Sequence, residues 1–298
     1  MCGIFGFDKR TNATEFMTPA LAIYMHERGR QSWGVTDGRQ VHKEPSDIID
    51  SFEEKFYSPA IYHTRAASVG EVTQGNAHPF TSVVGDLRVV GVHNGHISNH
   101  SELDTRYKRN FSVDSMHIFQ HLAERKDVSE LTGWGAVVWA ETQICKPEAP
   151  PQIFMSRFNT QDLHVVKLDT KEGELVWAST KSAIEAAMQL AGLRPKYFYK
   201  IEERVKYLIG PDGRLHNEGP LKWSQGMSGT SSSACGYDMR GRAAFSNAGR
   251  STFTGWVCAM PHCAKTIASM EDLICKHCFD AKMEEFFMGD AETAMVTV

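Results

Sequence analysis

The first residue that could do chemistry is a cysteine at position 2, followed by a glycine and a short apolar run in MCGIFGF. The run ends at Asp8 and Lys9 and no basic segment precedes it, so this start lacks the layout of an export signal. Two interpretations are open. Cys2 is either an ordinary buried residue of a first strand, or a residue that becomes the N-terminus once Met1 is removed.

A second group of cysteines lies near the C-terminus, where four of the seven in the chain fall within 21 residues. The spacing is C-x4-C, eleven residues, then C-x2-C, formed by Cys258, Cys263, Cys275 and Cys278. Two close pairs place four thiolates in tetrahedral reach, which is typical of structural zinc ribbons and knuckles. Such a site has no open position for catalysis, and a module this small depends on its metal for folding. His262 or His277 could replace one thiolate, and reduced free thiols are the alternative.

Three further polar features stand beside apolar segments in the first half of the chain. Arg65 ends an apolar run in YHTRAASVG, Asn94 and Gly95 follow another in VHNGHISNHSEL, and Asp114 precedes an apolar helical pattern. Each has an ordinary structural explanation. Arg65 could form a surface salt bridge, Asn-Gly is a strong hairpin-turn signal, and Asp is a common helix cap.

The order of these motifs resembles that of the class II glutamine amidotransferases. CGIFGF, RGRQSWG, HTRAASVG, HNGHISNHSEL and VDSMHI follow one another within residues 2–220. Five separated matches in one order weaken the ordinary explanations of the single motifs. The resemblance implies an α+β fold, the four-layer αββα sandwich of the N-terminal-nucleophile hydrolases, and an enzyme that hydrolyses L-glutamine.

The resemblance makes Cys2 the nucleophile, exposed by removal of Met1. A freed α-amino group, with an unperturbed pKa of about 7.7–8.0, suits a general base beside its own thiol. No distant histidine is then needed, and His63 and His93 are expected to pack beside strands. No cofactor is expected for catalysis.

The resemblance also implies groups that stabilise the reacting atoms. Asn94, through its side-chain amide, and Gly95, through its backbone N–H, are expected to bind the oxyanion of the tetrahedral intermediate. Arg28 of the RG loop is expected to order the region around the nucleophile. Gln31 in that loop stands where an acidic residue is common.

Four residues are implied to bind the substrate. Arg65 is expected to pair with the α-carboxylate of glutamine, because a guanidinium binds a carboxylate in bidentate fashion. Asp114 is expected to accept the α-ammonium, while Ser68 and Val69 line the site. Ala66, where many members carry a bulky side chain, suggests that a flap over the glutamine closes differently.

Secondary structure is expected where the apolar pattern has a defined period. Strands are predicted at 3–7, 60–67, 87–95, 135–141, 162–168 and 174–180. Helices are predicted from Pro19 to Gly29 after Thr18, at 115–126 after Ser112 or Asp114, and from Ser182 to Gly192. Strands mixed with helices suit a layered α/β or α+β domain.

The composition divides the chain into three parts. Residues 1–222 are predicted to form the amidotransferase domain, 223–253 a flexible linker, and 254–298 a zinc-ribbon-like module and tail. The linker is predicted from the composition of residues 224–251, which include seven Ser and five Gly in 28 positions. Such a stretch buries little apolar surface.

The whole composition excludes some function classes. Hydrophobic residues make up 42% and charged residues 23%, which is ordinary for a globular protein, and no apolar run is long enough to predict a membrane span. Seven cysteines without an export signal favour a reducing compartment, so a cytoplasmic location is expected. The net charge of −4 gives no preference for nucleic acid, which remains an alternative partner of the zinc module.

The chain shows no second enzyme-sized domain after residue 222 and no glycine-rich phosphate loop. The ammonia released from glutamine is therefore expected to go to a separate acceptor enzyme. One alternative is a stand-alone amidohydrolase that acts on a γ-glutamyl or related amide. Another is an inactive amidotransferase fold that serves as a scaffold while the zinc module binds a partner.

Overall fold

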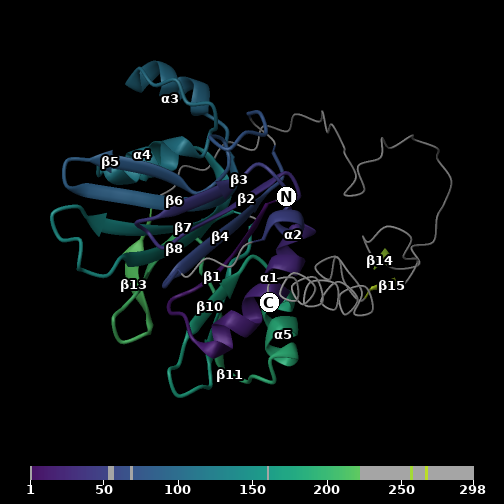
Figure 1. Cartoon of the computed structure of the whole chain (residues 1–298). Helices are drawn as coiled ribbons and strands as arrows, with labels where there is room; N and C mark the ends of the chain where they lie inside the picture. The colour runs from purple at the N-terminus through teal and green to yellow at the C-terminus, as the bar shows by residue number, and fades with distance from the viewer. Residues whose placement is uncertain are drawn as a thin grey trace, which may run out of the picture.

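The computed structural model describes residues 2–52, 57–67, 70–159 and 161–221, together with the backbone of two short strands further on. Two antiparallel sheets are stacked face to face, with helices on both outer faces (Figure 1). The predicted α+β class and four-layer αββα sandwich are confirmed. No helix in these described ranges is both long enough and apolar enough to cross a membrane.

The first sheet has seven strands with the N-terminal strand near its middle. In spatial order they are β11 (Pro195–Lys200), β9 (His164–Leu168), β10 (Leu175–Ala178), β1 (Gly3–Phe7), β4 (Ala60–Arg65), β2 (Ser32–Thr36) and β3 (Val41–Glu44). Every residue of β1 is buried, because the strand pairs with β10 on one side and β4 on the other. Cys2 therefore precedes a strand that is fixed on both edges.

The second sheet has six strands and carries the Asn-Gly motif. In spatial order they are β13 (Leu215–Pro220), β12 (Val205–Ile209), β8 (Gln152–Phe158), β7 (Gly133–Gln143), β6 (Leu87–Ile97) and β5 (Phe80–Val84). β6 and β7 stay in register from the pair Leu87 and Gln143 to the pair Ile97 and Gly133. Asn94 and Gly95 thus lie inside a strand, and the hairpin-turn explanation is wrong.

A hydrophobic core fills the space between the sheets. It includes Ile4 and Ile61 from the first sheet and Val92 and Val138 from the second. Side chains alternate between the two faces of a strand. Arg65 therefore shares the face of Ile61, and Asn94 shares the face of Val92. Both point into the space between the sheets, at one end of the sandwich.

Helices cover the two outer faces. They are α1 (Asn12–His26), α2 (Ile48–Ser51), α3 (His100–Tyr107), α4 (Met116–Ala123), the short 3-10 helix η1 (Val128–Glu130) and α5 (Lys181–Leu190). α1 and α5 pack together over the seven-stranded sheet, and α4 packs over the six-stranded sheet (Figure 1). The two helical layers bury the outer apolar face of each sheet, as a layered domain requires.

The predicted start of the first helix at Pro19 is wrong, because α1 begins at Asn12. Thr11 and Thr14 form a capping box, in which each side chain accepts from the backbone N–H of the other residue. The box satisfies two N–H groups that a helix start leaves free. Pro19 lies inside the helix, where the hydroxyl of Thr18 donates to the carbonyl of Thr14 at 2.7 Å. The helix ends at His26, before the predicted Gly29.

The remaining predicted elements are present. All six predicted strands are confirmed, with boundaries that shift by at most two residues. α4 and α5 lie within the two other predicted helices, apart from one additional residue at the start of α5.

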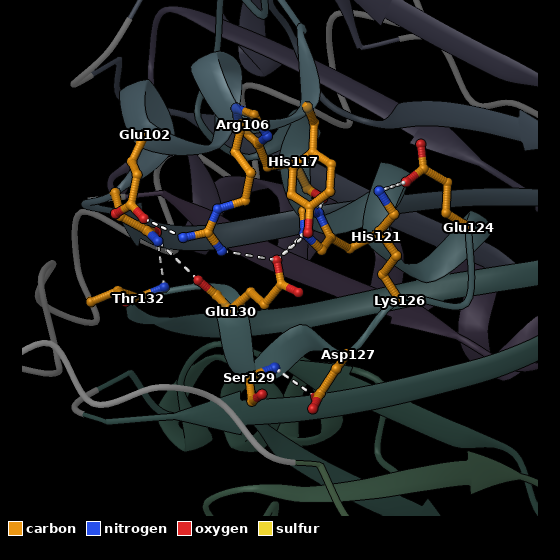
Figure 2. Close-up of polar contacts among 12 residues, drawn as sticks. Glu102, Arg106, His117, His121, Glu124, Lys126, Asp127, Ser129, Glu130 and Thr132 are labelled. Carbon is orange, nitrogen blue, oxygen red and sulfur yellow. Dashed lines mark hydrogen bonds and ion pairs between the residues drawn. The ribbon is translucent and has the colours of Figure 1, made fainter.

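A polar network ties α3 and the residue before it to η1 (Figure 2). Arg106 pairs with Glu102 at 2.5 Å and with Glu130 at 3.4 Å, and Tyr107 donates a short hydrogen bond to Glu130. Asn99 donates to the backbone carbonyl of Glu130 at 2.8 Å. The network holds α3 against η1.

The predicted zinc module falls largely outside the described residues. β14 (Trp256–Val257) and β15 (Thr266–Ile267) form an antiparallel pair within it. The four predicted zinc ligands, Cys258, Cys263, Cys275 and Cys278, and the predicted linker 223–253 lie outside the described residues. The zinc site and the three domain boundaries therefore stay predictions.

Candidate active site

Cys2 is half-buried beside the end of β4. The backbone N–H of Ala66 donates to Cys2 Sγ at 3.4 Å, and Arg28 Nε donates to the Cys2 carbonyl at 3.0 Å. The pKa of the Cys2 thiol is raised above its ordinary value, because the effect of burial outweighs that of the Ala66 N–H and of the Arg65 and Arg28 charges, which lower it. Hydrogen-bond donors and cations of this kind stabilise a thiolate over a thiol.

Arg28 is carried by the turn after α1, which passes close to the backbone of β4. A Cβ on Gly29 would lie 2.6 Å from the carbonyl carbon of Arg65, so this approach requires glycine. The N–H of Gln31 donates to the Arg65 carbonyl at 3.1 Å, and the Gln31 side chain accepts from the N–H of Ala67. Gln31 therefore fixes the segment that contacts the Cys2 thiol.

Arg65 ends β4 and is only 3% exposed, so the surface salt-bridge explanation is wrong. Its guanidinium donates to the carbonyls of Glu71 at 3.0 Å and Gly70 at 3.5 Å. Burial lowers the pKa of Arg65, and the negative charges of Cys2 and Asp114 raise it. A guanidinium held in this way, within electrostatic reach of the Cys2 thiol and the Asp114 carboxylate, is suited to bind an anionic group.

Asp114 is 4% exposed and bonds to β6. Its Oδ2 accepts from the N–H of Ile97 at 2.6 Å and lies 3.1 Å from His96 Nδ1. Burial alone would raise the pKa of Asp114, but His96, His93 and the Ile97 N–H hold it at about 2. The helix-cap explanation is wrong, because α4 starts after Ser115 without a side-chain cap. Asp114 is therefore an ionised carboxylate at neutral pH, suited to an ammonium group.

Asn94 and Gly95 occupy adjacent positions in β6. Asn94 is 2% exposed, and its Nδ2 donates to Gln161 Oε1 at 3.3 Å. Gly95 pairs with Gly135 of β7, and a Cβ on Gly95 would lie 2.0 Å from the carbonyl oxygen of Trp134. Glycine is needed here because the two strands approach too closely for any side chain.

Two buried histidines join the sheets beside these residues. His63 Nε2 lies 3.1 Å from the carbonyl oxygen of His93, and His93 Nδ1 lies 2.9 Å from the hydroxyl of Ser115. Burial lowers the pKa of His63 to about 3 and that of His93 to about 4. Both imidazoles are neutral at physiological pH and pack among the strands, as the sequence predicts.

The structure thus brings most of the predicted site residues to one end of the sandwich. Arg28 bonds directly to Cys2, and Arg65 interacts with both Cys2 and Asp114 through charge. β6, which carries Asn94, packs across the space between the sheets against β1 and β4. Ser68 and Val69 lie outside the described residues.

Three residues contact the candidate site residues in ways that the sequence motifs do not predict. Ala66 acts through its backbone N–H, His96 through its pairing with Asp114, and Gln161 through the amide of Asn94. His96 stands inside a quoted motif, but nothing in the pattern indicates its partner. Among the described residues no group of three or more His, Cys, Asp or Glu side chains is arranged to hold a metal ion.

Known proteins with similar sequences are glutamine amidotransferases. A sequence profile described as class-II glutamine amidotransferases matches residues 24–137. The glutamine–fructose-6-phosphate aminotransferase (isomerizing) of Streptococcus agalactiae is 34% identical over 146 residues, which cover 44% of this chain and 24% of that protein. The enzyme of the same name from Bacillus licheniformis is 36% identical over 123 residues, covering 39% and 20%.

Solved structures support the fold. The allosteric regulatory enzyme of purine biosynthesis aligns with a TM-score of 0.56 at 20% identity, over 73% of this chain and 48% of that chain. The glutamine phosphoribosylpyrophosphate amidotransferase of Bacillus subtilis aligns with a TM-score of 0.55 at 19% identity, over 73% and 49%.

The chain therefore shares the fold of these two solved enzymes. Within that fold, the part of the chain at residues 24–137 is similar to the class II glutamine amidotransferases. The chain spans about a quarter of the length of the curated relatives and about half of the solved chains.

Proposed function

We propose that this protein hydrolyses L-glutamine to glutamate and ammonia, with the Cys2 thiol as nucleophile, and delivers the ammonia to a separate acceptor enzyme. The observation that carries the proposal is the setting of Cys2. Its thiol accepts a hydrogen bond from the Ala66 N–H just after the end of β4. The buried guanidinium of Arg65, the last residue of β4, interacts electrostatically with both Cys2 and Asp114.

Glutamine fits this arrangement through its two charged groups and its amide. Arg65 pairs with the α-carboxylate and the ionised Asp114 with the α-ammonium, which orients the side-chain amide toward Cys2. Recognition of both α groups favours free glutamine or a γ-glutamyl amide over amides that lack them. Arg28 holds the Cys2 backbone from the other side.

The first half of the reaction forms a thioester. After removal of Met1, the α-amino group of Cys2 takes the thiol proton, and the thiolate attacks the amide carbon of glutamine. The N–H groups of Asn94 and Gly95 stabilise the resulting oxyanion. The C–N bond then breaks, the amide nitrogen takes the proton from the α-amino group, and ammonia leaves.

The second half regenerates the thiol. Water, activated by the same α-amino group, attacks the thioester carbon, the C–S bond breaks, and the proton returns to sulfur as glutamate leaves. The relatives, named as an aminotransferase that uses glutamine and as an amidotransferase, support the use of the ammonia by an acceptor. A reactive thiol also fits a reducing compartment, so we place the protein in the cytoplasm.

The C-terminal module has a separate role in this proposal. Cys258, Cys263, Cys275 and Cys278 hold one structural zinc ion, and the module docks the acceptor protein rather than taking part in hydrolysis. Support comes from the paired spacing of the four cysteines and from the Ser- and Gly-rich stretch before them.

A glutaminase assay tests the proposed activity. The purified protein should release glutamate and ammonia from L-glutamine in equal amounts, and Cys2→Ala should release neither. A matched control is Cys145→Ala, which removes the exposed thiol elsewhere in the described domain and should leave the rate unchanged. Hydrolysis that survives in Cys2→Ala, or no hydrolysis by the intact protein with any γ-glutamyl amide, contradicts the proposal.

A further inference from the structure

The connection between β8 and β9 brings an uncharged polar side chain against the amide that is to bind the oxyanion. Asn94 Nδ2 donates to Gln161 Oε1 at 3.3 Å, and Asn94 itself is 2% exposed. Gln161 belongs to none of the motifs that define the family resemblance. Its side chain nevertheless contacts the group on which the stability of the tetrahedral intermediate depends.

The connection is fixed to the sheet at several points. Asn159 takes a left-handed backbone conformation with φ of 62°, and its side chain donates to the Gly133 carbonyl at 2.6 Å. The guanidinium of Arg157 donates to the carbonyls of Asn159 at 3.1 Å and Gln161 at 3.5 Å. The N–H of Ile201 donates to the carbonyl of Leu163 at 2.9 Å. These bonds fix the backbone that presents Gln161 to β6.

The chemistry of an amide gives this contact a consequence for the reaction. A side-chain amide has a donor end and an acceptor end, and only the donor end stabilises an oxyanion. When Gln161 Oε1 accepts one N–H of Asn94, the second N–H is left to face the substrate. A rotated Asn94 would place its own oxygen against Gln161 Oε1, where two acceptors repel each other.

We propose that Gln161 is a positioning residue that holds the Asn94 amide with its N–H groups toward the reacting carbonyl. The inference rests on the proposed glutaminase function and adds to it a residue outside the known motifs. Gln161 acts through Asn94, so its effect belongs to the transition state rather than to the binding of glutamine.

The test replaces Gln161 with methionine, which has a similar length but no amide oxygen. For Gln161→Met we expect kcat to fall by about ten- to a hundredfold, because a misplaced oxyanion donor loses much of its effect. The KM for glutamine should change by less than about twofold. Gln189→Met, on the exposed face of α5, is the matched control and should leave both constants unchanged.

Two further measurements separate positioning from a merely structural role. Alkylation of Cys2 by iodoacetamide forms no oxyanion, so its rate should be the same in Gln161→Met and the parent protein. In an Asn94→Ala background, Gln161→Met should have no further effect on kcat, since the group that it positions is absent.

Several results would overturn the positioning role of Gln161. Unchanged or raised kcat in Gln161→Met overturns it, and so does an equal loss of kcat with and without Asn94. A parallel loss of Cys2 alkylation also overturns it, because the variant then disturbs the nucleophile. An inactive parent protein overturns the proposed function together with the inference, whereas an active parent with an unaffected variant overturns the inference alone.

Discussion

His63 Nε2 and the carbonyl oxygen of His93 lie 3.1 Å apart and join the two sheets next to the active site. His63 stands two residues before Arg65 in β4, and His93 stands one residue before Asn94 in β6. This hydrogen bond therefore fixes β4, which carries Arg65, against β6, which carries Asn94. Both histidines are buried and contribute to this end of the sandwich through packing and hydrogen bonds.

The buried histidines make the stability of the domain depend on pH. Burial lowers the pKa of His63 to about 3, that of His93 to about 4, and that of His78 well below its ordinary value. In the unfolded chain these imidazoles take up protons near pH 6.5, while the folded chain excludes them. Their contribution is therefore complete above pH 6.5 and is lost as the pH falls toward 4. The depressed pKa of Asp114, about 2, acts only below this window.

Urea unfolding at pH 7, 6 and 5 measures this effect. Each buried histidine should contribute up to about 1.4 kcal/mol of lost unfolding free energy per pH unit below 6.5. His78 is the residue to change, since neither ring nitrogen has a hydrogen-bond partner among the described residues. His78→Leu should reduce the slope. A stability that is flat between pH 7 and 5 would show that the buried imidazoles take up protons freely.

Removal of the Arg65 side chain should act mainly on substrate binding. We expect Arg65→Ala to raise the KM for glutamine by at least about tenfold with a smaller change in kcat, because the contact with the α-carboxylate is present before the reaction starts. Arg30→Ala, in the exposed part of the RG loop, is the control. Steady-state kinetics checks both variants, and an unchanged KM in Arg65→Ala would mean that another group binds the carboxylate.

Addition of one methyl group at position 95 should disrupt the site. The Cβ of Gly95→Ala would lie 2.0 Å from the Trp134 carbonyl oxygen, so β6 and β7 must move apart. We expect a loss of about 1–3 kcal/mol or more in unfolding free energy together with loss of glutaminase activity. Gly75→Ala, whose Cβ would meet nothing closer than 3.9 Å, should change stability by less than about 0.5 kcal/mol. A stable and active Gly95→Ala protein would contradict the assigned close approach.

The predicted zinc module should be dispensable for hydrolysis. Metal analysis under reducing conditions should find about one zinc ion per full-length chain and none in a chain that ends near residue 222. The shortened chain should still hydrolyse free glutamine but should fail to deliver ammonia to its acceptor. A metal-free full-length protein would disprove the zinc site. A folded but inactive shortened chain would show that the module belongs to the active site.

Six strands could be predicted from the sequence, but the interior strands β2, β8 and β12 and all the edge strands could not. β11, β3, β13 and β5 are the edge strands of the two sheets, and none was predicted. Edge strands carry charged residues and prolines that discourage further pairing, and this hides the apolar alternation by which a strand is recognised. β3, with the sequence VHKE, and β13, with LHNEGP, illustrate the point.

In the candidate site, too, only some of the features could be predicted from the sequence. The order of the motifs indicates Cys2, Arg65, Asn94 and Asp114 as a set, because their side chains carry the chemistry. The contacts that fix them involve many backbone atoms, such as the N–H of Ala66 beside the Cys2 thiol. A backbone N–H is available at almost every position, so the sequence alone does not tell which one faces the nucleophile.

The most direct test of the nucleophile is covalent labelling with 6-diazo-5-oxo-L-norleucine, an electrophile with the shape of glutamine. Intact-mass measurement and peptide mapping should find a single adduct on Cys2, at the N-terminus of a chain that has lost Met1. The extent of labelling should match the loss of glutaminase activity, and excess glutamine should slow it. A label on Cys145 instead of Cys2, or full activity in protein that retains Met1, would contradict the account.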